Sequence, residues 1–69
     1  MTCQSLINYF IVDTISGITY EPYVCMDSYL VAYPNTANGK QTVINFSRLT
    51  KGLTERRYRL TPKQRQNTI

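Results

Sequence analysis

The sequence predicts a mainly β fold: a small five-stranded meander, or SH3-like partly open barrel, with a short C-terminal turn or tail. Three observations predict this class. The chain has 69 residues, the size of a single domain. Its apolar residues gather in short runs rich in β-branched and aromatic side chains, as in strands. Glycine, proline and asparagine separate these runs, as they do at tight turns.

The first half of the chain predicts a β-hairpin. Residues 5–12 (SLINYFIV) are apolar on both alternate faces, which favours a central strand covered on both sides. Asp13 can close a turn with its side chain and Gly17 can supply a positive φ, so the chain is expected to reverse here. The second strand is predicted at residues 18–25. Because Pro22 has no N–H to donate, this strand is expected to be an edge strand or to be bulged at Pro22.

The middle of the chain predicts a second hairpin. Residues 28–33 (SYLVAY) and 41–49 (QTVINFSRL) both have the composition of strands. Between them, Asn38 and Gly39 form the strongest hairpin signal in the chain, because both tolerate the left-handed backbone of a type I′ turn.

The last part of the chain predicts a fifth strand and a tail. Gly52 interrupts the pattern, and residues 56–60 (RRYRL) then alternate, with Tyr58 and Leu60 turned inward. Residues 61–64 have the pattern of a helix start, but the segment 62–68 has no apolar side chain except that of Pro62 to bury. We therefore expect a domain over residues 1–61 and a flexible basic tail over 62–69. The alternative fold is α+β, with one helix around residues 47–57.

The two cysteines test the predicted hairpin register. If the first hairpin turns near residue 15, Cys3 and Cys25 lie diagonally across it, with Cβ atoms about 7–8 Å apart. A disulfide needs a Cβ separation of about 3.8 Å. This register predicts reduced thiols, in agreement with a cytoplasmic protein, and a shift of one or two residues would reverse the prediction.

The sequence predicts a cytoplasmic protein that is complete as given. No apolar run approaches the roughly 20 residues that a membrane-spanning helix needs. The longest such run near the start is at residues 9–12, and no basic segment precedes it, so no signal peptide is predicted.

Composition argues against catalysis. The chain has no histidine, the residue most often used as a general base. Its glycines are isolated, and its acidic residues are scattered. Two cysteines are too few for a structural zinc site. We expect a protein that is not an enzyme and that uses no metal or cofactor.

Positive charge is concentrated in the last third of the chain. Residues 1–47 carry one lysine and three acidic residues, a net charge of −2. Residues 48–69 carry seven basic residues and one acidic residue, a net charge of +6. Such asymmetry indicates a charged partner, because guanidinium groups bind carboxylates and phosphates bidentately. The candidate binding residues are Arg48, Lys51, Arg56, Arg57, Arg59, Lys63 and Arg65, with Tyr29 and Tyr33, which would share one strand face.

These features favour a small binding or regulatory protein. The first hypothesis is an inhibitor or accessory factor that docks on the acidic surface of a larger protein or protein–nucleic-acid complex. Tyrosine and arginine are the residue types that most often dominate such interfaces. The alternative is a small β-barrel module that contacts the phosphates of DNA or RNA through Arg57, Arg59 and their neighbours. An open strand edge beside Pro22 would also permit a homodimer, and no membrane partner is expected.

Overall fold

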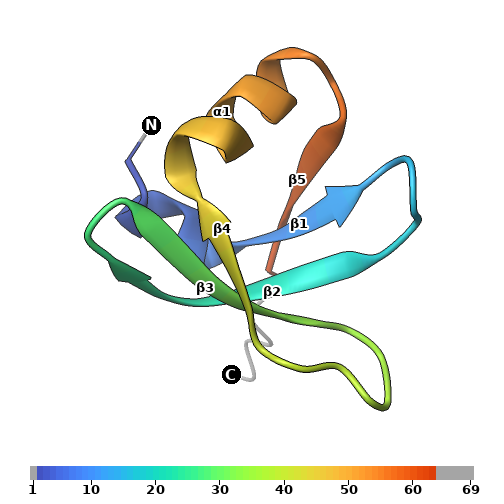
Figure 1. Cartoon of the computed structure of the whole chain (residues 1–69). Coiled ribbons are helices and arrows are strands. Elements are labelled where there is room, and N and C mark those ends of the chain that lie inside the picture. Colours follow the sequence, from blue (N-terminus) through green and yellow to red (C-terminus); the bar gives the residue numbers. More distant parts are fainter. Residues whose placement is uncertain (1, 64–69) are drawn as a thin grey trace, which may run out of the picture.

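The computed structural model describes residues 2–63 and consists of one antiparallel sheet and two short helices (Figure 1). Its elements are, in chain order, the 3-10 helix η1 (Gln4–Asn8), strands β1 (Tyr9–Asp13), β2 (Thr19–Met26), β3 (Tyr29–Pro34) and β4 (Thr42–Asn45), helix α1 (Phe46–Thr54) and strand β5 (Tyr58–Pro62). The strand order is β4-β3-β2-β1-β5, and all pairs are antiparallel. The predicted mainly β class with five strands is confirmed.

The sheet is strongly curved but does not close into a barrel. Strands β4 and β5 are the two ends of the strand order, and α1, which joins them in the chain, contacts both (Figure 1). Leu49 of α1 is fully buried, and Phe46 and Leu53 pack against the core from the same helix. The helix therefore covers the open side of the sheet, and it supplies the helix that the alternative fold placed around residues 47–57.

The predicted fourth strand is too long, because a helix begins inside it. Residues 41–49 were expected to be extended, but the strand ends at Asn45. The side-chain Oδ1 of Asn45 accepts a hydrogen bond from the backbone N–H of Arg48 at 3.1 Å. This bond satisfies one of the free N–H groups at the helix start, which is why asparagine is a preferred N-cap residue.

The first predicted strand also begins later than expected. Residues 5–8 belong to η1, which Thr2 and Ser5 begin with hydrogen bonds between their side chains and backbones. This turn directs Leu6 inward, where it is fully buried with Ile11, Leu30 and Leu49 as the centre of the core. Strand β1 then runs between β2 and β5, so its central position is confirmed.

The first hairpin has the predicted turn. The Oδ1 atom of Asp13 accepts hydrogen bonds from the backbone N–H groups of Ile15 and Ser16 at 3.0 and 3.3 Å. Gly17 adopts a φ of 79°. The turn leads into a register that pairs Ile11 with Tyr20 and Val12 with Thr19.

Pro22 lies at a bulge in a central strand. Strand β2 is flanked by β1 and β3, and the β2–β3 register shifts between Pro22 and Val24. Of the two predicted possibilities, the bulge is therefore confirmed and the edge strand is wrong. The bulge changes the alternation of β2, so that Cys25 pairs with Leu30, a core residue.

The predicted type I′ turn at Asn38 and Gly39 is wrong. Neither residue has a positive φ, which a type I′ turn requires of both central residues. The pairing of Ala32 with Thr42 instead leaves a longer connection, held by a hydrogen bond from the Gly39 N–H to the Thr36 carbonyl at 3.1 Å. The two-residue hairpin turn is at residues 27–28, where Asp27 has a φ of 56°.

Strand β5 is an edge strand that extends past the predicted domain boundary. Thr61 and Pro62 pair with Phe10 and Tyr9 of β1, so these residues are extended and do not begin a helix. The Lys63 N–H continues the connection with a hydrogen bond to the Asn8 carbonyl at 3.0 Å. The rest of the predicted tail, residues 64–69, lies outside the described residues.

Cys3 and Cys25 form a disulfide, so the prediction of reduced thiols is wrong. Their Cα atoms are 6.1 Å apart. The expected register failed because Cys3 lies just before η1 instead of in a strand, and because the bulge at Pro22 turns Cys25 toward the core. Disulfides persist in oxidising compartments. The cytoplasmic location therefore stays a prediction that the thiols no longer support.

Nothing among residues 2–63 has the length and hydropathy of a helix that could span a membrane.

Loss of the disulfide should destabilise the protein substantially. The bond closes a loop with a sequence separation of 22 residues. Replacing both cysteines, Cys3→Ser with Cys25→Ser, should lower the free energy of unfolding by about 3 kcal/mol, because the unfolded chain regains loop entropy. Urea unfolding followed by circular dichroism measures this change. Wild-type protein in reductant serves as the control and should match the double variant. Two reactive thiols in the native, untreated protein would contradict the disulfide.

Candidate functional site

Helix α1, the loop after it and strand β5 bring five cationic side chains to one part of the surface. All five are exposed, and they come from residues 48–59, where Glu55 is the only acidic residue. We call this set the basic surface: Arg48, Lys51, Arg56, Arg57 and Arg59. Five of the seven predicted basic residues therefore lie in one continuous part of the fold.

Tyr58 lies at the centre of the basic surface, between two adjacent hollows. The first has a volume of about 170 Å³ and is lined by Arg48, Lys51, Gly52, Glu55, Arg57 and Tyr58. The second has a volume of about 360 Å³ and is lined by Thr14, Leu53, Arg56, Tyr58, Arg59 and Leu60. We call them the cationic hollow and the apolar hollow, after the side chains that distinguish them.

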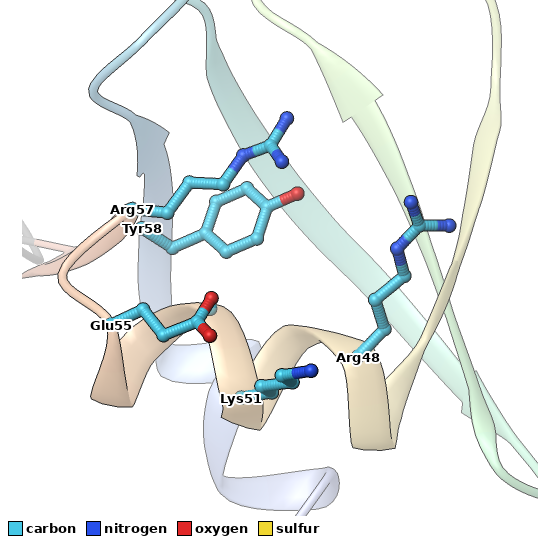
Figure 2. Close-up of a pocket in the computed structure, with 6 residues that line it drawn as sticks. Arg48, Lys51, Glu55, Arg57 and Tyr58 are labelled. Atoms are coloured by element: carbon cyan, nitrogen blue, oxygen red, sulfur yellow. The ribbon is translucent and has the colours of Figure 1, made fainter.

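Figure 2 shows how the side chains around the cationic hollow are arranged. Arg48 and Lys51 extend from successive turns of α1, Glu55 is the residue that caps its C-terminal end, and Arg57 and Tyr58 come from the chain that follows. The Tyr58 side chain lies alongside the helix with its hydroxyl group directed toward the side of Arg48, and Arg57 runs along the ring. Three cationic groups from two segments therefore border one space.

Gly52 allows the Tyr58 ring to lie directly on the helix. A glycine inside a helix costs about 1 kcal/mol relative to alanine, so a packing reason is expected for it. A Cβ atom built on Gly52 would lie 2.6 Å from Cε2 of Tyr58, much closer than a van der Waals contact allows. The sequence showed Gly52 as an interruption, whereas in the structure it is the surface against which Tyr58 packs.

A Schellman turn directs the chain from α1 into β5. The Arg57 N–H donates to the Gly52 carbonyl at 2.8 Å, and the Arg56 N–H donates to the Leu53 carbonyl at 3.1 Å. These are the two hydrogen bonds of the Schellman motif, with Arg56 at the left-handed position, where its φ is 63°. The motif places Arg57 and Tyr58 immediately beside the helix.

Arg57 is held in place on several sides. Its carbonyl accepts hydrogen bonds from the N–H and the hydroxyl of Thr14, at 2.9 and 2.8 Å. Its guanidinium lies 5.5 Å from the centroid of the Tyr58 ring, within cation–π range. It also lies 3.9 Å from the buried carboxylate of Asp13, which offsets part of its charge. Arg57 is thus the most restrained cation of the basic surface.

Lys63 lies apart from the basic surface. Its Nζ donates to the Pro22 carbonyl at 3.2 Å and is 3.6 Å from the Glu21 carboxylate. The same group lies 5.6 Å from the centroid of the Phe10 ring. These contacts join the chain just after β5 to β2, and the role of Lys63 in binding stays a prediction. Arg65, the remaining predicted basic residue, lies outside the described residues.

Tyr29 and Tyr33 lie on the face of the sheet that points away from the core. They alternate along β3 with the buried residues Leu30 and Ala32, so the two tyrosines share one face, as predicted. They are 46% and 40% exposed. Tyr23 joins them, because its ring packs edge-on against that of Tyr33 with the centroids 5.6 Å apart.

More apolar side chains lie on this face than the sequence pattern predicted. We call them together the tyrosine face: Tyr23, Val24, Met26, Tyr29, Tyr33 and Val43, all of which are exposed. The bulge after Pro22 is responsible for part of it, since it brings Val24 opposite Val31 on the outer face. Pro22 was the available signal for this bulge, but its position did not show which side chains would turn outward.

Comparisons with known proteins give no relative from which a role could be transferred. No protein-family model, no curated protein and no solved structure matches this chain. Within the described part of the chain, no group of three or more His, Cys, Asp or Glu residues is placed to hold a metal ion. The function is therefore inferred from the two surfaces themselves.

The contact between Gly52 and Tyr58 should reverse the usual effect of alanine in a helix. In an unconstrained helix, Gly52→Ala would raise the free energy of unfolding by about 1 kcal/mol. Here we expect a decrease of about 1 kcal/mol, because overpacking against the ring costs more than the helix gains. In a Tyr58→Ala background the same substitution should be stabilising. Urea unfolding of the four proteins measures this coupling. Stabilisation in both backgrounds would contradict the contact.

The left-handed position of Arg56 should favour glycine. Arg56→Gly should raise the free energy of unfolding by about 0.5–1 kcal/mol, because it relieves backbone strain that exceeds the added entropy of the unfolded chain. Arg59→Gly is the matched control, since it removes the same charge from an extended residue of β5 and should be destabilising. Thermal unfolding compares the two. Equal effects of the two substitutions would argue against a left-handed Arg56.

Proposed function

We propose that this protein is a non-catalytic regulatory factor that docks on an acidic surface of a larger protein or protein–nucleic-acid complex. The basic surface makes the principal contact, and the protein acts as an inhibitor or accessory factor by occupying that site. One observation carries the proposal: five exposed cations surround Tyr58, and Glu55 is the only acidic residue in their segment.

The composition of the basic surface suits a protein partner. Four of its five cations are arginines, whose planar guanidinium groups bind carboxylates in a two-point geometry that lysine cannot reproduce. Arginine and tyrosine are also enriched among residues that dominate binding energy at interfaces. Its charge would steer encounters with an acidic partner and orient the complex before close contact.

The tyrosine face offers the same partner a second contact region. Its tyrosine, methionine and valine side chains are exposed side by side, whereas monomeric proteins rarely leave large contiguous apolar areas uncovered. Tyrosine and methionine are enriched at protein interfaces. A partner that contacts both surfaces would bury apolar area on one and neutralise charge on the other.

The arrangement favours a protein over a nucleic acid. Single-stranded nucleic acids bind where exposed aromatic rings lie among cations. In this protein the Tyr58 ring is partly buried, its Cδ2–Cε2 edge packs against Gly52, and the Arg57 guanidinium lies over the ring, so Tyr58 is a poorer platform for a base than an exposed tyrosine. Among the exposed tyrosines, Tyr33 has an acidic neighbour instead of a cation, because Glu21 pairs with it across β2 and β3.

Charge reversal on the basic surface tests the proposal. Arg48→Glu should weaken binding to labelled poly-glutamate, a mimic of an acidic protein surface, by about tenfold, or about 1.4 kcal/mol. Lys40→Glu makes the same change of charge in the exposed β3–β4 loop and should have a much smaller effect. Fluorescence anisotropy over a salt titration measures both.

The same assay includes the alternative partner. Labelled duplex DNA, single-stranded DNA and RNA are titrated under identical conditions. Micromolar binding to one of them at physiological salt, lost when Arg57 and Arg59 are both replaced by alanine, would overturn the protein-docking proposal and support the nucleic-acid alternative.

A further inference from the structure

The two hollows beside Tyr58 differ in chemistry although they share a wall. Tyr58 lines both, so a ligand group in one hollow lies next to a group in the other. The first hollow is lined mainly by charged side chains. The second is lined by the hydrocarbon of Leu53, Tyr58 and Leu60, with two arginines at its border. Two adjacent hollows of different chemistry select a ligand more specifically than a general positive potential does, because an anionic group and an apolar group of the ligand must lie side by side.

The cationic hollow is suited to one carboxylate group. Arg48 and Lys51 approach it from α1, and Arg57 approaches from the loop with a guanidinium already positioned by Asp13 and Tyr58. Because Arg57 is restrained before binding, it loses less side-chain entropy when it binds an anion. Glu55 also lines the hollow, and this negative charge disfavours a multiply charged group there.

The apolar hollow is suited to one large apolar side chain. Leu53, Tyr58 and Leu60 line it and are only partly buried, so part of their hydrocarbon is exposed to solvent. Its volume of about 360 Å³ is about twice that of the cationic hollow. Arg56 and Arg59 also line it, so the segment around the apolar group would meet positive charge on this side as well.

We propose that the two hollows are adjacent subsites for a short acidic segment of a protein partner. A glutamate or aspartate of that segment occupies the cationic hollow, and a neighbouring leucine or aromatic side chain occupies the apolar hollow. Charge complementarity identifies the occupant as acidic, since five exposed cations border the two hollows. The exposed hydrocarbon of the apolar hollow adds the requirement for an apolar side chain. The inference rests on the proposed docking function and adds a sequence preference to it.

This preference separates an acidic peptide from other anions. Poly-glutamate fills the cationic hollow but leaves the apolar hollow to water. A nucleic acid supplies phosphates, but Tyr58 is partly buried and already contacts the Arg57 guanidinium, so it offers a base a poorer stacking surface than an exposed ring would. A peptide with an apolar side chain between acidic residues satisfies both subsites at once. Burying that side chain should therefore add affinity that does not depend on salt.

The test uses the oxidised protein, residues 1–69, and two labelled peptides. One peptide alternates glutamate and aspartate around a central leucine, and the other has serine in place of the leucine. At physiological salt the leucine peptide should bind about tenfold more tightly in fluorescence anisotropy, which corresponds to about 1.4 kcal/mol. Lys51→Gln should weaken binding of both peptides, whereas Lys40→Gln should affect neither.

Amide chemical-shift mapping on wild-type protein locates the contact without a substitution in the core. Both peptides should shift the amide signals of Arg48 and Lys51. Only the leucine peptide should shift those of Leu53 and Leu60, which line the apolar hollow. Shifts on the tyrosine face instead of on α1 and β5 would overturn the assignment of the subsites.

The peptide and poly-glutamate affinities together distinguish failure of the subsite inference from failure of the docking function. Equal affinity for the two peptides would overturn the inference but leave the docking function intact, because charge alone would then explain binding. Failure of both peptides to bind while poly-glutamate binds would also overturn it. If neither the peptides nor poly-glutamate binds, the docking function itself fails. Tighter binding of single-stranded DNA or RNA at the same amides would overturn the inference in favour of a nucleic acid.

Discussion

The contact of the Tyr58 ring with the bare backbone of Gly52 is the constraint on which the basic surface depends. It brings the start of β5 against α1, so cations that are several residues apart in the chain border the same hollow. The Schellman turn at Arg56 and Arg57 makes this approach possible by reversing the chain within a few residues. A longer connection would leave α1 free to move relative to β5, and the two hollows would lose their common wall.

The same region also completes the fold. A chain of this length buries a limited share of its surface, so each covered edge contributes noticeably to stability. Helix α1 covers the open side of the sheet with Leu49, while η1 covers another part of the core with Leu6 and is tied to β2 by the disulfide. Because α1 contributes both to the core and to the basic surface, substitutions on its exposed side separate function from folding more cleanly than substitutions on its buried side.

Sequence patterns predicted the features that depend on neighbouring residues. The alternation of residues 56–60 correctly predicted that Tyr58 and Leu60 turn inward. The turn predicted at Asp13 is also present, closed by its side chain. The predictions that failed concern features that depend on contacts between segments distant in the sequence. Asn45 has a favourable side chain for a helix cap, but its strand-like neighbours concealed the helix start. The disulfide depended on where η1 places Cys3 and on the bulge after Pro22, and neither position follows from local composition. The segment 48–69 was recognised as basic from the sequence, but the two hollows could not be predicted, because they form only where α1 packs beside β5.

The distribution of acidic residues explains why the basic surface retains its charge. Asp13 is buried beside Arg57, Glu21 pairs with Lys63, and Asp27 occupies the β2–β3 turn. Two of the three acidic residues in the first half thus join distant segments of the fold, and each does so with a residue near an end of β5. Arg48, Lys51, Arg56 and Arg59 make no ion pair within residues 2–63. Their charge therefore remains available to a partner, at a site whose shape is set by Gly52 and Tyr58.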